Sequence, residues 1–163
     1  MASDLQPGTY DGPNATLRYA LQTVPRADSL LVAFPKLRAG AARPPVGLRR
    51  VLGDIRAHRL YLGADQHTFV GPQRRMYGMH AGLELIERET TSLGVMRERV
   101  VCLGTSMGAV CAMVAGLMYG AGRVVVGAAP VHCGTALQRF VGAKYGRKAA
   151  APEVLALVEA PGG

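Results

Sequence analysis

Residues 100–108 read Val-Val-Cys-Leu-Gly-Thr-Ser-Met-Gly, an apolar run that ends in a Gly-x-Ser-x-Gly pattern. A buried strand before this pattern and a small-residue helix after it are typical of a nucleophile elbow, a sharp strand-to-helix turn that exposes a serine. Side chains two residues before and after the serine would collide with neighbouring backbone, and glycine removes them. We predict that Ser106 stands at the carboxyl edge of a sheet, with the Met107 N–H placed to stabilise an oxyanion. The alternative is a purely structural Gly-rich turn.

Length and composition indicate a globular protein. The chain has 163 residues, of which 49% are hydrophobic and 18% charged, and we expect a single domain over 1–163. No apolar stretch is long enough to predict a membrane span, and the first residues lack the features of a signal peptide, so we expect a cytoplasmic protein. An odd number of cysteines without metal-ligand spacing predicts reduced thiols and no metal site: Cys102, Cys111 and Cys133. We also expect no cofactor.

The net charge of +8 raises the question of a nucleic-acid partner. The nineteen Lys and Arg residues are spread along the chain, and no basic helix interleaved with aromatic residues is present. We therefore predict a solvated, Arg-rich surface and no nucleic-acid partner, with weak attraction to acidic groups as the remaining effect of the charge.

Hydrophobic patterning predicts strands that alternate with helices after an extended lead-in over 1–14. The predicted strands lie near 17–21, 29–34, 59–62, 100–103 and 123–127, and the predicted helices near 44–55, 72–93 and 107–119. The remaining segment, 130–163, reads as irregular and basic with a short terminal helix. This alternation predicts an α/β fold with a predominantly parallel sheet and helices on both faces.

The elbow, the long helix before it and the small-residue helix after it resemble the central part of an α/β-hydrolase, over roughly residues 28–135. Short glycine-containing motifs are similar to hydrolase-fold proteins found with bacterial glycan and capsule enzymes, including acyltransferase-like members of accessory secretion systems: 61–63, 119–122 and 127–130. The resemblance implies a partial α/β-hydrolase fold. It also implies a serine ester hydrolase or acyl transferase that acts on a small-molecule or glycan ester, with a role in polysaccharide biosynthesis.

Carried onto this chain, the family pattern makes Ser106 the nucleophile and the Met107 N–H one oxyanion donor. The second donor is expected after the strand near 29–34. Because proline has no N–H, Lys36 is the nearest candidate, and Phe34 is the alternative. The His-Gly-Gly motif of lipases is absent from this loop, which argues against a lipase.

In this family the acid and then the histidine base follow the serine. The segment after Ser106 holds two glutamates near its end, no aspartate and one histidine, His132. A complete hydrolase has two further strands, so the chain reads as a truncated or degenerate homologue. His132 follows the strand next to the elbow strand and is the candidate base; the competing reading is a loop histidine without a catalytic partner.

Asp65 and His67 follow the strand near 59–62 and are either substrate contacts or a polar turn. Two function classes therefore compete: a serine enzyme with an incomplete triad, and a non-catalytic interaction module that retains the elbow. The apolar edge of the last predicted strand, at 124–126, predicts self-association or a partner enzyme in either case.

Overall fold

The structure, a computed structural model, describes residues 4–12, 15–34, 48–52, 55–63, 77–105 and 107–127. The chain divides into two compact units at residue 129, and every described residue belongs to the first unit. The irregular segment and the terminal helix predicted over 130–163 lie outside the described residues. The single-domain interpretation of 1–163 therefore stays a prediction.

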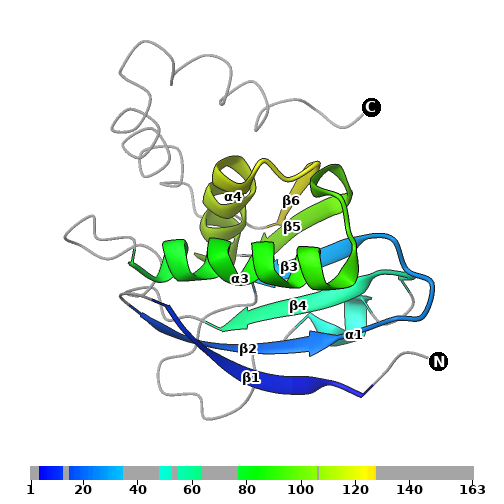
Figure 1. Cartoon of the computed structure of the whole chain (residues 1–163). Helices are drawn as coiled ribbons and strands as arrows, with labels where there is room; N and C mark the ends of the chain where they lie inside the picture. The colour runs from blue at the N-terminus through cyan, green and yellow to red at the C-terminus, as the bar shows by residue number, and fades with distance from the viewer. Residues whose placement is uncertain are drawn as a thin grey trace. The chain divides into compact units, whose positions relative to one another are not determined.

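A six-stranded mixed sheet forms the centre of the described part (Figure 1). Across the sheet the order is β1 (Gln6–Asp11), β2 (Thr16–Gln22), β4 (His58–Gly63), β3 (Leu30–Phe34), β5 (Val100–Thr105) and β6 (Arg123–Gly127). β4, β3, β5 and β6 pair in parallel, whereas β1 and β2 pair in antiparallel with their neighbours. The predicted α/β class with a mostly parallel sheet is confirmed.

The predicted extended lead-in contains β1, a true edge strand paired with β2. Pro7 and Gly8 hide this strand from sequence analysis, because both residue types are depleted in strands and Pro is tolerated only at an edge. Gly8 gives room to the Tyr19 ring, because a Cβ at this position would lie 2.5 Å from the end of that side chain, which would have to shift. The Thr16 hydroxyl donates to Asp11 Oδ1 at 2.8 Å and so links the two strands beside the turn.

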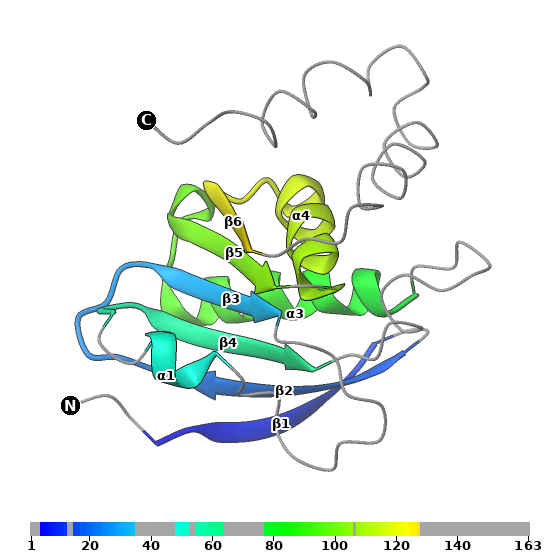
Figure 2. The same ribbon diagram turned by 180° about the vertical axis from the view of Figure 1, so that it is seen from behind.

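Helices lie on both faces of the sheet, as predicted (Figures 1 and 2). α3 (Tyr77–Leu93) and α4 (Met107–Tyr119) cover one face and contact each other. α1 (Arg49–Leu52) lies on the opposite face, within the helix predicted over 44–55; Leu48 and Ile55 are described and are not helical, so the predicted helix extends too far at Ile55. The first residues predicted for the long helix, 72–76, are outside the described part.

The central strand β3 is buried at all five positions, which explains its uninterrupted apolar sequence. Alternate side chains of a strand point to opposite faces, so Leu31 and Ala33 share a face that Leu30, Val32 and Phe34 do not. The α1 face carries a cluster of buried residues: Ala20, Leu31, Ala33, Leu52, Ala57 and Tyr61. Two apolar layers therefore enclose the sheet.

α4 ends at the predicted stop. Gly120 adopts a φ of +77°, and its N–H donates to the Gly116 carbonyl at 3.0 Å, the arrangement of a left-handed C-terminal cap. The chain then passes so close to the turn before β5 that a Cβ at Gly122 would lie 1.9 Å from the Glu98 carbonyl oxygen. These two glycines allow β6 to follow α4 with no long loop.

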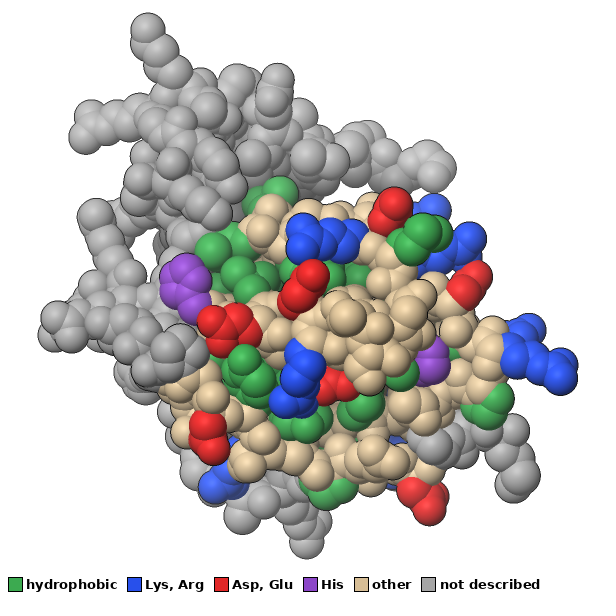
Figure 3. All heavy atoms as spheres, in the orientation of Figure 1, with side chains coloured by type: hydrophobic (Ala, Val, Ile, Leu, Met, Phe, Trp, Pro, Cys, Tyr) green, Lys and Arg blue, Asp and Glu red, His purple; other side chains and the backbone are tan. Residues whose placement is uncertain are grey.

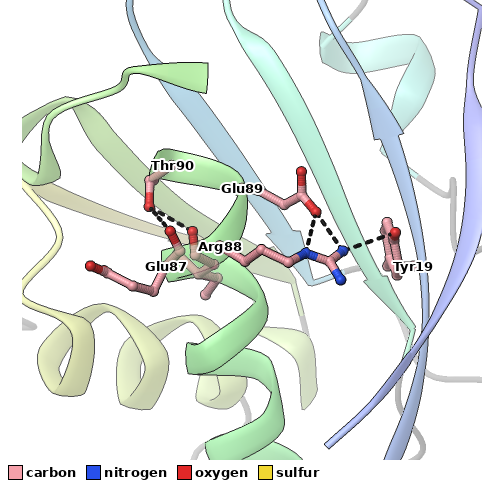
Figure 4. A network of polar contacts seen from close by, with 6 residues as sticks. Tyr19, Glu87, Arg88, Glu89 and Thr90 are labelled. Carbon is pink, nitrogen blue, oxygen red and sulfur yellow. Dashed lines mark hydrogen bonds and ion pairs between the residues drawn. The ribbon is translucent and has the colours of Figure 1, made fainter. Parts of the chain in front are cut away.

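A guanidinium-centred cluster anchors α3 to the first two strands (Figure 4). Arg88 Nε and Nη2 donate to Glu89 Oε1 at 2.9 and 2.5 Å, and Nη2 also donates to the Tyr19 hydroxyl at 3.0 Å. The guanidinium carbon lies 5.0 Å from the centre of the Tyr10 ring, within cation–π range. The Glu89 side chain is 9% exposed, so Arg88 neutralises a carboxylate that is nearly excluded from water.

A second polar contact joins α3 to α4. The Thr90 hydroxyl donates to the Ile86 carbonyl at 2.7 Å, so it accepts from the Tyr119 hydroxyl, 2.8 Å away. Both side chains are buried, and a satisfied hydrogen bond between them fixes the spacing of the two helices.

We expect Arg88→Met to lower the free energy of unfolding by about 1–3 kcal/mol, because it leaves the Glu89 carboxylate buried without its guanidinium. The matched control is Arg99→Met, which removes the exposed ion pair with Asp28 and should cost at most about 0.5 kcal/mol. Urea denaturation of the full chain, followed by circular dichroism, measures both. Equal losses in the two variants would contradict a special role for the Arg88 cluster.

Candidate active site

The bounds of β5 and α4 agree with those of an elbow. β5 ends at Thr105 and α4 begins at Met107, so Ser106 is the single position between them. Ser106 itself lies outside the described residues. The strand predicted near 100–103 and the helix predicted over 107–119 are both confirmed, with the strand extended by two residues.

The backbone closes tightly around this position. A Cβ at Gly104 would lie 2.1 Å from the Gly108 carbonyl oxygen and 2.9 Å from the Ala109 nitrogen, distances that no real Cβ tolerates. The end of β5 therefore presses directly against the first turn of α4. This close approach is the geometry for which a Gly-x-Ser-x-Gly pattern is suited.

The first turn of α4 supplies hydrogen-bond donors at the same place. The first four N–H groups of an α-helix have no acceptor within the helix, and they carry the positive end of the helix dipole. In α4, a helix of 13 residues, these groups begin at Met107. An oxyanion formed near position 106 would meet both a donor and a favourable field.

Four parallel strands end at the edge of the sheet where the elbow lies. In the strand register Phe34 pairs with Gly104, and Thr105 pairs with Gly127, so β3, β5 and β6 finish side by side. β4 ends at Gly63 on the far side of β3. Ligands of open α/β sheets bind at this carboxyl edge, which makes it the candidate site.

Each remaining candidate follows one of these strand ends. Lys36 follows β3 and His132 follows β6, and these strands are the two neighbours of β5. Asp65 and His67 follow β4, one strand further away. All four residues lie outside the described part, and their roles stay predictions. Phe34, the alternative oxyanion donor, is the last residue of β3 and is 2% exposed.

Two histidines, His58 and His80, lie among the described residues. His58 begins β4 at the opposite edge of the sheet, where its Nδ1 accepts from the Val24 N–H at 3.2 Å and its Nε2 lies 3.2 Å from the Ala27 carbonyl oxygen. It thus ties the turn after β2 to the start of β4. His80 is exposed on α3.

Cys102 is no competing nucleophile. It is fully buried in β5, and burial raises the pKa of its thiol from 9.0 to about 12, so the group is a neutral thiol at physiological pH. Cys111 is also buried, and Cys133 lies outside the described residues. Within the described ranges no three His, Cys, Asp or Glu residues gather in a way that would hold a metal ion.

The α3 face of the molecule shows basic side chains interspersed with acidic ones (Figure 3). Two ion pairs on this side, Arg88 with Glu89 and Arg97 with Glu87, are part of that mixture. On this face the described charges are of mixed sign, and the absence of a nucleic-acid partner stays a prediction. None of the helices in the described part is long and apolar enough to cross a membrane.

Comparison with known proteins identifies the fold. Neither a protein-family model nor a curated protein sequence matches the chain. Among solved structures, a chain of the Glycosylation Associate Protein (Gap123) complex from Streptococcus agalactiae is similar, with a TM-score of 0.62 and 14% identity. The match covers 83% of this chain and 26% of that one.

Esterase structures are similar as well. A putative carboxylesterase from Lactobacillus plantarum has a TM-score of 0.55 at 9% identity, covering 78% of this chain and 60% of that one. S-formylglutathione hydrolase from Staphylococcus aureus has a TM-score of 0.54 at 12% identity, covering 76% and 55%. The chain therefore has part of the α/β-hydrolase fold, and it spans only a quarter to three fifths of the length of these proteins.

We expect Gly104→Ala to lower the free energy of unfolding by about 3 kcal/mol, because the new methyl group would overlap backbone atoms of α4 that cannot move aside. The control is Gly127→Ala at the end of the neighbouring strand, where a Cβ would lie 3.7 Å from the Thr105 side chain and fits without a clash. Thermal or urea unfolding of the full chain compares them. A Gly104→Ala protein as stable as the control would show that the elbow is not closed as described.

Proposed function

We propose that the chain is a serine-dependent ester hydrolase or acyl transferase that acts through Ser106 on a small-molecule or glycan ester. The observation that carries this proposal is the approach of Gly104 to the Gly108 carbonyl between the end of β5 and the start of α4. Esterases are among the proteins of similar fold, and the similar Gap123 structure is described as glycosylation-associated. The predicted cytoplasmic location and a role in polysaccharide biosynthesis belong to the same proposal.

In the proposed reaction the Ser106 hydroxyl attacks the ester carbonyl carbon and gives its proton to a general base. The carbonyl oxygen becomes an oxyanion, stabilised by the Met107 N–H and by a second N–H from Lys36 or Phe34. Collapse of this intermediate breaks the bond to the alcohol, which leaves with the proton from the base. The acyl group on Ser106 then passes to water in a hydrolase or to an acceptor hydroxyl in a transferase.

His132 is the proposed base, because it follows the strand next to the elbow strand. Strand order ranks it above His67, whose strand is separated from β5 by β3. Asp65 and His67 are proposed substrate contacts at the far side of the same edge. A complete triad also needs a carboxylate that orients the histidine, and we assign none.

The second candidate function is a non-catalytic module that binds a partner protein. The similarity to a chain of a multi-protein complex favours it. In this case the elbow serves only to turn the chain between β5 and α4, and the Ser106 hydroxyl is not activated.

A fluorophosphonate probe separates the two candidates, since only an activated serine is labelled. We expect the full chain to be labelled and Ser106→Ala to lose the label entirely. Ser92→Ala, a change at an exposed serine near the end of α3, is the control and should be labelled like the unchanged protein. Mass spectrometry of the labelled peptide identifies the modified residue. An unlabelled but folded protein would favour the interaction module.

Turnover of an activated ester tests the base. We expect weak hydrolysis, because residual catalysis by a nucleophile and oxyanion donors persists without a full triad. His132→Ala should lower kcat about 100-fold or more, whereas His67→Ala should change kcat less than about tenfold. Retention of turnover in His132→Ala would show that the base is elsewhere.

A further inference from the structure

The turn that joins β2 to β3 has a backbone conformation that its own residues do not favour. Residues 24–27 form a β-turn that is closed by the Ala27 N–H, which donates to the Val24 carbonyl at 3.2 Å. Arg26, at the third position of this turn, has a φ of +58°, in the left-handed region where glycine is the usual residue. A residue with a side chain persists in this region when surrounding contacts hold it there.

The His58 imidazole contacts both ends of this turn. Its Nδ1 accepts from the Val24 N–H at 3.2 Å, and its Nε2 lies 3.2 Å from the Ala27 carbonyl oxygen. The backbone of the same residue is fixed as well, because its N–H donates to the Ser29 carbonyl at 2.9 Å where β4 begins to pair with β3. The His58 residue is 7% exposed, so these contacts are largely shielded from water.

The two contacts together require one protonation state of the ring. A backbone N–H can only donate, so Nδ1 carries no proton. A carbonyl oxygen can only accept, so the hydrogen bond to Ala27 requires a proton on Nε2. His58 is therefore neutral and in its Nε2–H form. A second proton would go to Nδ1 and would place two N–H groups against each other at Val24.

Two other side chains hold the turn, and neither can replace this acceptor. Arg56 Nη2 donates to the Arg26 carbonyl at 3.2 Å, and Arg99 forms an exposed ion pair with Asp28. Neither interaction provides an acceptor for the Val24 N–H. Loss of the His58 contact therefore leaves that N–H without its partner.

The charged groups around His58 are mostly arginines, and several of the carboxylates are already paired. The charged residues on the turn, on β2 and β4, on the segments that lead into β1, β4 and β5, and on the last part of α3 are Asp4, Arg18, Arg26, Asp28, Arg56, Arg59, Glu87, Arg88, Glu89, Arg97, Glu98 and Arg99. Three of these carboxylates form ion pairs with arginines: Asp28, Glu87 and Glu89.

We propose that His58 is an acid-sensitive switch on the turn between β2 and β3. Protonation of its ring releases the Val24 N–H and opens residues 24–27, while the strands stay paired. The contact is present while the ring is neutral and is lost as the pH falls through the range in which His58 gains its proton. The turn lies at the amino ends of the parallel strands (Figure 1), so the switch does not depend on whether Ser106 is catalytic.

Amide hydrogen exchange of the full chain, measured by NMR between about pH 7.5 and about pH 5.5, tests the proposal. The values are corrected for the effect of pH on intrinsic exchange. We expect exchange of the Val24 N–H to rise about fivefold or more at the lower pH, the factor that corresponds to loss of one hydrogen bond. Val32, which is buried in the central strand β3, is the internal reference and should not change.

Two matched variants assign this response to one histidine. His58→Gln removes the ionisable ring, so the Val24 N–H should exchange at the same corrected rate at both pH values. His80→Gln is the same change at an exposed histidine of α3 and should keep the full acid response. An unchanged protein without the acid response, or a response that persists in His58→Gln, would overturn the proposal.

The ring nitrogens of His58 give a second readout that needs no variant. In protein with isotope-labelled histidine, the ring that lies close to the Val24 N–H should be in the neutral Nε2–H form at about pH 7.5. On protonation this ring should lose its contact with the Val24 N–H. A proton on Nδ1 at the higher pH, or a protonated ring that keeps the contact, would also overturn the proposal.

Discussion

The contact between the Gly104 backbone and the Gly108 carbonyl oxygen governs the arrangement of the rest of the structure. Because no side chain separates the two segments, α4 turns back on β5 immediately and lies across β5 and β6. A second glycine of α4 allows a close contact with the sheet. The Val124 side chain packs against Gly116, where a Cβ would leave no room for it. The helix is thus held against the sheet near its start and again over β6.

The close packing of α4 against β5 and β6 explains the amino-acid composition of the helix. Residues 109–115 are all buried and consist of alanines with valine, cysteine and methionine, so the helix has no polar face over that stretch. Small side chains keep the helix close to the strands, and the Tyr119 hydroxyl near its end makes a polar contact with Thr90 of α3. α3 has the complementary role: it carries Arg88 and Glu89 and presents the charged surface. One helix is specialised for packing and the other for solvent.

A helix or strand is predictable from the sequence when its own residues determine its conformation. It is less predictable when contacts with distant residues determine it. α4 and β6 were predicted with the bounds that the structure has, because glycines mark their ends and apolar residues fill them. β1 was missed as a strand because it owes its conformation to β2 and not to Pro7 or Gly8. The candidate site is less predictable than the fold because its residues follow the ends of strands. The periodic hydrophobic pattern that shows which way side chains point within a strand or helix does not extend into these segments. Ser106 is the exception among the candidates, because the glycines at 104 and 108 predict a sharp turn at its position from the sequence alone.

The amino ends and the carboxyl ends of the parallel strands differ in the polar groups that they carry. At the amino edge, His58 bonds the turn after β2, Arg99 pairs with Asp28, and Gly122 passes against Glu98, so these polar groups are committed to holding turns together. At the carboxyl edge, β5 ends between β3 and β6, and the first turn of α4 presents N–H groups without helical acceptors. A polar group stabilises the fold when it has a fixed hydrogen-bond partner. A group that binds an oxyanion must instead have a hydrogen bond still to make. Among the described residues, the polar groups that hold turns together therefore lie at the amino edge, whereas the first turn of α4 brings hydrogen-bond donors to the carboxyl edge, where ligands of open α/β sheets bind.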